Sequence, residues 1–394
     1  MHNYKPYILS VAITQKCNFN CRYCFTTKDQ NSRAETINLK DYCTLLDEAI
    51  ELGITQVIFY GGEPLMHPDI IDIIKATYGR GLIIRCIFTN GSLISDEILD
   101  TILLYKSYIK YLPEFHISFD GFGNMHNEFS QTETEQLVLQ NIDKVKKLGF
   151  YVKVHLVLCQ TNEPFLKDTI SYMDDSEIDA MRVLKLMPSP KWLTYKKNTE
   201  YKTDKEWYDL TLKYVEWYSE NEHNMNLEFW NTVTMYPKDK RLRILPVKGC
   251  KNFNDDIDLA CPLYETTISV DGNGYLLPCH QMGGIMSFEG VQYKNAIKDG
   301  LKNALADETF NKHIMMTTGE KRKRFKECID CKYWEWCVGG CPLYGWRWRK
   351  DTSDEFPVYL DISKCVFFKN NYISKIKESL NDNWDIDKGD FPWD

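Results

Sequence analysis

The sequence predicts an α/β fold of six β/α units, too few for a full eight-stranded barrel, followed by a smaller cysteine-rich region. Two observations support this fold class. Short runs rich in β-branched and aromatic residues alternate with longer runs of helical periodicity up to about residue 187. Polar or glycine-rich turns follow each expected strand, which is where a parallel β/α barrel builds its active site.

Each expected strand is a run of four to eight apolar residues, and each expected helix is a longer run with an apolar face. The strands are expected at residues 7–13, 56–60, 82–88, 115–119, 151–158 and 181–186. The helices between them are expected at residues 39–52, 69–78, 96–106, 135–148 and 163–173.

Composition excludes several classes of protein. The chain has 394 residues, 43% of them hydrophobic, which suffices for two or three compact domains. A net charge of -8 argues against nucleic-acid or anionic-membrane partners, because both favour a basic surface. No apolar run spans a bilayer and the start does not resemble a signal peptide, so a cytoplasmic protein is expected. In that compartment its 14 cysteines indicate metal or cluster ligation rather than disulfides.

Three cysteines directly follow the first expected strand: Cys17, Cys21 and Cys24. A 4Fe-4S cluster normally takes four cysteine ligands, so three thiolates leave one iron open to a small chelating molecule. The alternative is a zinc site, which usually pairs two Cys-x2-Cys knuckles instead of using such a run.

The spacing of these cysteines, with Phe25 behind them, resembles the signature of the radical S-adenosylmethionine (SAM) enzymes. The resemblance implies a partial (β/α)6 TIM-like barrel in which the methionine group of S-adenosylmethionine chelates the open iron. Reductive cleavage then gives a 5′-deoxyadenosyl radical. Gly-Gly-Glu-Pro after the second strand resembles the family's GGEP motif, which receives the methionine ammonium; alone it would be an ordinary turn. The cofactor-binding residues implied are Phe25, Gly61, Gly62, Glu63, Asn90, Ser118 and Asp120.

One family feature has no counterpart. An arginine on the helix after the fourth strand often pairs with the methionine carboxylate, and residues 133–141 contain none.

The remaining cysteines form a second pattern: Cys261, a Gly-x4-Cys ending at Cys279, a C-x2-C-x5-C-x3-C run, and Cys365. This pattern resembles the SPASM domain, a C-terminal extension of radical SAM enzymes, and residues 265–279 have the composition of a hairpin. The resemblance implies two auxiliary 4Fe-4S clusters. One would be held by Cys261, Cys279 and Cys341, with Cys250 as fourth ligand, and the other by Cys328, Cys331, Cys337 and Cys365. An open site at the first of these, or a pair of zinc ribbons, is the alternative.

The expected domains are a barrel (1–190), a helical bridge (191–249) around an amphipathic helix at 204–220, the SPASM region (250–370) and an acidic tail (371–394). The end of the tail, from residue 381, is expected to be disordered or loosely docked. The basic run at 321–326 is expected to be a solvated face, or to attract an acidic peptide. Cys43 and Cys86 are expected to be small buried hydrophobes. Cys159 ends the fifth strand and is a candidate catalytic hydrogen-atom donor.

The family resemblance implies an enzyme that abstracts hydrogen from a residue of a ribosomally synthesised peptide, leading to a crosslink, epimerisation or rearrangement. A flavodoxin- or ferredoxin-type donor would supply electrons. No leader-binding segment precedes the first strand, so the substrate would be recognised directly or through a separate recognition protein. Alternatives are a sulfatase-type formylglycine maturase, which carries Asp where this chain has His280, and a small-molecule dehydrogenase. An iron–sulfur electron carrier is the alternative of another class, although a carrier needs no cofactor cleft.

Overall fold

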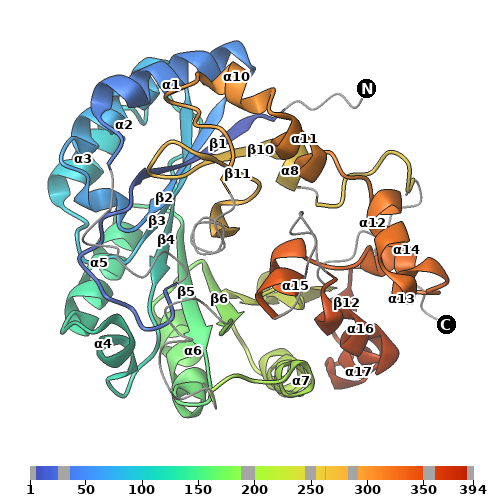
Figure 1. The fold of residues 1–394 in the computed structure, drawn as a ribbon. Helices are drawn as coiled ribbons and strands as arrows, with labels where there is room; N and C mark the ends of the chain where they lie inside the picture. Colours follow the sequence, from blue (N-terminus) through green and yellow to red (C-terminus); the bar gives the residue numbers. More distant parts are fainter. Residues whose placement is uncertain are drawn as a thin grey trace.

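The structure is a computed structural model, and it describes residues 6–24, 36–187, 200–244, 254–261, 263–282, 292–348 and 360–387. Its centre is one twelve-stranded sheet in the order β11-β10-β1-β2-β3-β4-β5-β6-β7-β8-β9-β12. Figure 1 shows this sheet curving as an open barrel wall, with helices α1 to α6 around its outer side. The helices α12 to α17 of the C-terminal region lie at the opposite side of the barrel.

The first six strands pair in parallel and in chain order, which confirms the expected α/β class. They are β1 (Ile8–Thr14), β2 (Gln56–Gly61), β3 (Ile83–Thr89), β4 (Glu114–Ser118), β5 (Val152–Leu158) and β6 (Ala180–Lys185). The helices on the outer side are α1 (Leu39–Glu51), α2 (Ile70–Gly79), α3 (Asp96–Leu104), α4 (Met125–Ser130), α5 (Glu135–Lys147) and α6 (Leu166–Asp175). Short 3-10 turns precede α2 and α6, at η1 (Pro64–Met66) and η2 (Glu163–Phe165).

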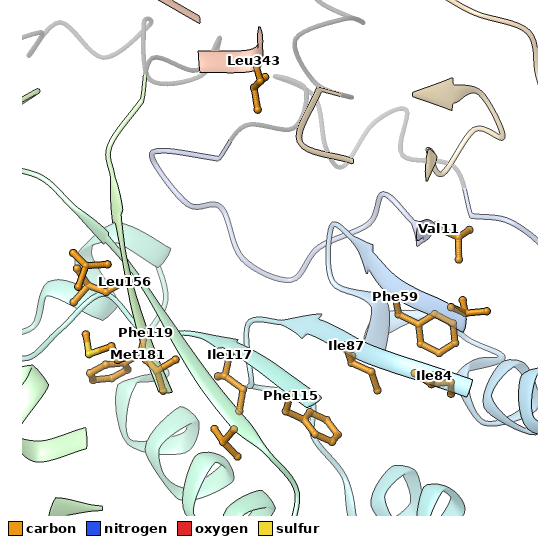
Figure 2. Packing of buried hydrophobic residues seen from close by; sticks show 14 of the residues in the cluster. Val11, Phe59, Ile84, Ile87, Phe115, Ile117, Phe119, Leu156, Met181 and Leu343 are labelled. Carbon is orange, nitrogen blue, oxygen red and sulfur yellow. The ribbon is translucent and has the colours of Figure 1, made fainter. Parts of the chain in front are cut away.

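The core lies between the sheet and these helices. Alternate strand residues such as Val11, Phe59, Phe115, Ile117 and Leu156 are fully buried in one cluster, and Figure 2 shows their side chains between the strands and helices. Because neighbouring residues of a strand point to opposite faces, the residues between them lie on the inner face of the barrel. The amphipathic pattern therefore sets which side chains face the barrel interior.

The expected helical bridge contains more than its helix. The helix α7 (Asp204–Glu220) lies where the sequence predicts it, and begins with a capping box made by Thr203 and Glu206. Three strands follow it: β7 (Asn226–Phe229) pairs in parallel with β6, and β8 (Val233–Tyr236) and β9 (Arg241–Ile244) continue the sheet in antiparallel fashion. These four-residue strands are too short for a clear periodic signal, and the expected domain boundaries stay a prediction.

The described part of the C-terminal tail is ordered, contrary to the expectation of a loose end. After α16 (Ile362–Lys369), the tail forms α17 (Tyr372–Ser379) and β12 (Asp385–Ile386), which pairs with β9. Trp384 is only 6% exposed, and its indole Nε1 donates a hydrogen bond of 3.1 Å to the carbonyl of Ser219. Burial of this large side chain explains why the acidic segment docks on α7.

The second cysteine region is joined to the barrel through the sheet. The strand β10 (Thr267–Val270) pairs in parallel with β1 and forms an antiparallel hairpin with β11 (Leu276–Leu277), which confirms the expected hairpin. Short helices make up most of the remainder: α8 (Leu263–Thr266), η5 (His280–Met282), α10 (Leu301–Leu305), α11 (Glu308–Ile314), α12 (Thr318–Arg324), α13 (Lys326–Ile329), α14 (Trp334–Cys337) and α15 (Pro342–Trp348).

Two further expectations are corrected by burial. Lys321, the first residue of the basic run, is 0% exposed instead of lying on a solvated face. Cys43 is only half-buried because α1 turns Tyr42, Leu45, Leu46 and Ala49 to the core, whereas Cys86 is buried as expected. Across the described ranges, no helix is both long and apolar enough to cross a membrane.

Candidate functional site

The first three cysteines lie in a loop, residues 15–24, that follows β1 at the carboxyl edge of the sheet. All three are half-buried, and the Cys17 thiol accepts a hydrogen bond of 3.4 Å from the backbone N–H of Phe19. Burial raises the pKa of Cys17 to about 12, and the nearby charges of Glu63 and Cys24 add to the shift. Without a metal this thiol keeps its proton, and metal binding would release it.

Gly61 and Gly62 bring the end of β2 against the start of this loop. A Cβ on Gly61 would lie 2.1 Å from the Thr14 carbonyl oxygen, and one on Gly62 would lie 2.3 Å from the Lys16 carbonyl oxygen. Gly62 donates its N–H to Thr14 at 2.9 Å, and Glu63 donates to Lys16 at 2.8 Å. The glycines therefore permit close packing within the chain, in addition to the approach of a ligand expected from sequence.

Glu63 is fully buried and joins the ends of β2 and β3. Its Oε1 accepts hydrogen bonds from Leu65 N at 3.0 Å and Thr89 Oγ1 at 2.8 Å, and its Oε2 accepts from Asn90 N at 2.6 Å. Burial raises the pKa of Glu63 to about 7, although these three donors oppose the shift. The carboxylate thus fixes the rim, and its contact with a methionine ammonium stays a prediction.

Asn90 connects this rim to the cysteine loop. Its Nδ2 donates to Asn18 Oδ1 at 2.8 Å and lies 4.0 Å from the Cys17 sulfur. Its Oδ1 accepts from the N–H of Ser92, whose hydroxyl accepts from Asn18 at 2.9 Å. The side chains of Asn18, Asn90 and Ser92 therefore hold one side of the loop.

Asp120 holds the other side of the cysteine loop. Tyr23 donates its hydroxyl to Asp120 Oδ2 at 2.5 Å, and Val157 N donates to Oδ1 at 3.1 Å. The carboxylate is buried, and burial raises the pKa of Asp120 to about 7. Ser118 lies half-buried two residues earlier, at the end of β4.

The short helix α4 also contacts the loop, and the sequence did not predict it. Asn20 and Arg22 donate their backbone N–H groups to the carbonyls of Ser130 at 3.1 Å and Phe129 at 3.0 Å. Arg22 also forms an ion pair of 2.7 Å with Glu128. With only six residues, α4 gives too little periodicity to be recognised in the sequence.

The inner face of the barrel carries an aromatic and imidazole cluster that sequence analysis missed. The ring of Phe88 lies 4.7 Å from that of His116, 5.8 Å from that of His155 and 5.7 Å from that of His280. Burial lowers the pKa of all three histidines, and that of His280 to about 4. The available signal was the alternation of polar with apolar residues along two strands, with His116 following Glu114 in β4 and His155 following Lys153 in β5.

His280 comes from the second cysteine region, directly after Cys279. Its ring also lies 5.3 Å from that of Tyr60, whose hydroxyl donates to the carbonyl of Val270 in β10 at 3.0 Å. At the hairpin turn, a Cβ on Gly272 would lie 2.6 Å from the Gln15 side chain. The hairpin thus contacts the start of the cysteine loop and places Cys279 beside the inner face of the barrel.

The later cysteines that the structure describes lie in two groups, and their assignment to two clusters stays a prediction. Burial raises the pKa of Tyr264, and the nearby Cys261, Cys279 and Cys341 add to the shift. The pKa of Cys328 is raised to about 11 by burial and by the nearby Cys365 and Cys331, and that of Cys337 to about 12 by burial and Cys365. Cys250 and Phe25 lie outside the described residues.

The residues present fit iron–sulfur clusters in their chemistry, since each set consists of cysteine thiols and clusters take thiolates. In the part of the chain that the structure describes, no three His, Cys, Asp or Glu side chains are placed to hold one metal ion. A cluster differs from a single-ion site because each of its cysteines binds a different iron.

Cys159 is buried in an apolar pocket made by Met125, Phe129 and Leu186. Its thiol donates to Glu200 Oε2 at 3.5 Å, and burial raises the pKa of Cys159 to about 11. Its role as a hydrogen-atom donor stays a prediction.

Comparison with known proteins agrees with this geometry. A family profile described as the Radical SAM superfamily matches residues 11–171. GTP 3',8-cyclase of Clostridium perfringens is 30% identical over 186 residues, which cover 46% of this chain and 55% of the cyclase. AdoMet-dependent heme synthase of Oleidesulfovibrio alaskensis is 23% identical, covering 46% of each chain. The chain thus spans about half the length of these curated relatives.

Among solved structures, Streptococcus suis SuiB bound to the precursor peptide SuiA has a TM-score of 0.65 at 17% identity, covering 91% of this chain and 76% of SuiB. Native anSMEcpe with bound AdoMet and Cp18Cys peptide has a TM-score of 0.67 at 16% identity, covering 95% of this chain and 99% of that one. These likenesses extend beyond the first six strands, and at such low identity they concern the fold. The radical SAM fold implies a 4Fe-4S cluster and S-adenosylmethionine binding. Residues 11–171, which include the cysteine loop and its rim, therefore match the Radical SAM superfamily, and the solved structures share the fold of the chain beyond them.

Proposed function

We propose that the chain is a radical SAM/SPASM maturase that abstracts hydrogen from a residue of a ribosomally synthesised peptide. The observation that carries the proposal is the junction between the two cysteine regions. The strand β10 pairs with β1, and the segment after the hairpin places Cys279 and His280 beside Tyr60 and Phe88 at the inner face of the barrel. A second redox group at the inner face of the barrel suits an enzyme that must remove an electron from its substrate.

The choice of a peptide substrate rests on the extent of the similarities. The match to GTP 3',8-cyclase covers 46% of the chain, whereas the structures of SuiB and anSMEcpe with bound peptides match 91% and 95% of it. A chain that resembles peptide-binding proteins over both cysteine regions is better explained by peptide modification than by nucleotide cyclisation.

In this proposal, Cys17, Cys21 and Cys24 hold three irons of the first cluster, while Glu63, Asn90 and Asp120 keep their loop in place. When bound, this cluster and S-adenosylmethionine supply the carbon-centred oxidant. Residues 250–370 form the SPASM region, whose two cysteine sets hold auxiliary clusters, with Cys250 as a further ligand. A flavodoxin- or ferredoxin-type protein delivers electrons.

A formylglycine maturase is the second candidate, since anSMEcpe has a TM-score of 0.67 and was solved with a bound peptide named Cp18Cys. This chain has His280 where the sulfatase-maturating relatives of this type are expected to carry Asp. The mass change of the product distinguishes the two candidates, because formylglycine formation alters one Ser or Cys and forms no crosslink.

The test is co-expression of the chain with a short peptide encoded beside its gene, followed by mass spectrometry of the peptide. Anaerobic protein with dithionite and S-adenosylmethionine should release 5′-deoxyadenosine and modify the peptide. The triple variant Cys17→Ala/Cys21→Ala/Cys24→Ala should do neither, while Cys43→Ser, a half-buried cysteine of α1, should retain both. Release of 5′-deoxyadenosine with modification only of a sugar or nucleotide would refute the peptide assignment.

A further inference from the structure

Lys321 is completely buried beside both cysteine sets. This residue of α12 is 0% exposed, and its Nζ donates a hydrogen bond of 2.8 Å to the carbonyl of Gly340. Cys337 and Cys341, which belong to different sets, flank that carbonyl in the sequence. Both thiols, together with Cys261, lie within electrostatic reach of the ammonium.

The backbone is shaped around this side chain. Gly339 and Gly340 have φ angles of +71° and +64°, a conformation that residues with a side chain rarely adopt. A Cβ on Gly339 would lie 2.8 Å from Lys321 Cε. The glycine turn that connects Cys337 to Cys341 therefore fits closely around the side chain of Lys321.

A buried ammonium needs negative charge nearby, because transfer of an unpaired ion out of water costs several kcal/mol. Among the described residues, no carboxylate forms an ion pair with Lys321. The nearest carboxylate in electrostatic terms is Asp361, and its Oδ1 accepts from Ser363 and its Oδ2 from Cys341 N at 3.1 Å. The remaining source of negative charge is the cysteine sets themselves.

A second buried cation lies close by. Lys364 is 2% exposed, and its Nζ donates to the carbonyl of Asn231. It lies within electrostatic reach of Asp361, Cys337 and Cys341. Asp204 also faces Lys364, and it forms an ion pair of 2.6 Å with Lys185. Three ammonium groups and two carboxylates thus leave an excess of one positive charge beside the thiols.

The rest of the basic run behaves differently. Arg322 forms an ion pair of 3.1 Å with Asp255, and Lys323 and Arg324 are exposed. Only Lys321 of these four is enclosed by the turn between the two sets. The run therefore combines one buried charge with an ordinary solvated face.

We propose that Lys321 is a fixed positive charge that raises the reduction potential of the iron–sulfur clusters held by the two later cysteine sets. This inference rests on the proposed auxiliary clusters. One-electron reduction of an oxidised cluster by a substrate radical, or by dithionite in the test, adds one negative charge next to the ammonium. In a water-excluded environment the cation stabilises that charge strongly, and cluster potentials depend on such local charge. Lys321 thus favours acceptance of the substrate's electron.

The test compares Lys321→Met and Lys321→Gln with Lys323→Met, a matched control on the exposed side of the same helix. All are made in the Cys17→Ala/Cys21→Ala/Cys24→Ala background, so that only auxiliary clusters contribute. Iron and sulfide are quantified, and reduction is followed by electron paramagnetic resonance during a potentiometric titration. The glutamine variant keeps a donor for Gly340 while removing the charge, and so serves if the methionine variant does not fold.

Both Lys321 variants should be reduced at lower potential, with the reduction equilibrium shifted at least tenfold, about 59 mV for a one-electron couple. The Lys323→Met protein should titrate like its parent. Unchanged potentials in iron-loaded Lys321 variants would overturn the inference and leave the maturase proposal intact. A shifted potential in the Lys321 variants, together with no peptide modification by the wild-type chain in the co-expression test, would support the inference and count against the maturase. Absence of auxiliary iron in the parent protein would overturn both the inference and the proposed SPASM clusters.

Discussion

The buried carboxylate of Glu63 should make the stability of the rim depend on pH, and Glu63→Gln should remove that dependence. Burial raises the pKa of Glu63 from its ordinary value of 4.5 to about 7. Between these values the folded chain holds a proton that the unfolded chain has lost, so stability falls as the pH rises. At about 1.4 kcal/mol per pH unit, the total loss is about 3 kcal/mol.

The Glu63→Gln variant cannot ionise at this position, but it loses one of the three hydrogen bonds. Its amide oxygen can still accept from Leu65 N and Thr89 Oγ1, as Oε1 of Glu63 does, but its NH2 group faces the N–H of Asn90. Loss of that one buried bond costs about 1–3 kcal/mol. At pH 5 the variant should therefore be less stable by this amount, and by pH 8 the difference should have moved by about 3 kcal/mol in the variant's favour.

Urea unfolding of the metal-free, reduced chain at pH 5, 6, 7 and 8 measures this difference. The exposed Glu97→Gln substitution on α3 serves as the control for removing a carboxylate. A constant difference between wild type and Glu63→Gln at every pH would show that Glu63 ionises in the folded chain as it does in the unfolded one. The argument from burial would then be wrong.

Three further predictions concern the loop, the rim and the tail. Tyr23→Phe removes the hydroxyl that donates to Asp120, so it should cost about 1.5–3 kcal/mol and lower the iron retained by the first cysteine loop, measured as iron per chain. Gly62→Ala places a Cβ 2.3 Å from a loop carbonyl and should abolish 5′-deoxyadenosine release, while Gly79→Ala, where a Cβ meets nothing within 4 Å, should retain it. Trp384→Ala should destabilise the chain by about 3–5 kcal/mol in thermal unfolding; an unchanged midpoint would mean that the docked tail contributes nothing.

The sequence predicted the barrel strands well because their apolar runs are continuous and their helices are long enough to show periodicity. The helix α7 even has the expected bounds, Asp204–Glu220, since a capping box and a long aromatic face define it. Strands β7, β8 and β9 were missed because four residues each carry little pattern and because their pairing is decided by the sheet they extend.

In the candidate site, too, some features could be predicted from the sequence and others could not. Motif spacing identified the cysteine loop, Glu63, Asn90 and Asp120, and the structure places these residues around one rim. Motif spacing could not show that the carboxylates of Glu63 and Asp120 accept their hydrogen bonds from other residues of the chain, because such bonds depend on tertiary contacts.

Lys321 illustrates the limit most clearly. In the sequence it is one of several adjacent cations, which normally indicates a solvated face. In the structure, the left-handed turn at Gly339 and Gly340, between Cys337 and Cys341, encloses it. A run of charged residues in the sequence therefore predicts an exposed face, whereas the burial of one of its residues depends on the tertiary fold around it.

The most direct test of the central claim is metal analysis of anaerobically prepared protein, comparing wild type with the Cys17→Ala/Cys21→Ala/Cys24→Ala variant. If these three thiolates hold a 4Fe-4S cluster, the variant should lose about four irons per chain relative to wild type. Stoichiometric zinc in the wild-type protein, or equal iron in the two proteins, would contradict the account.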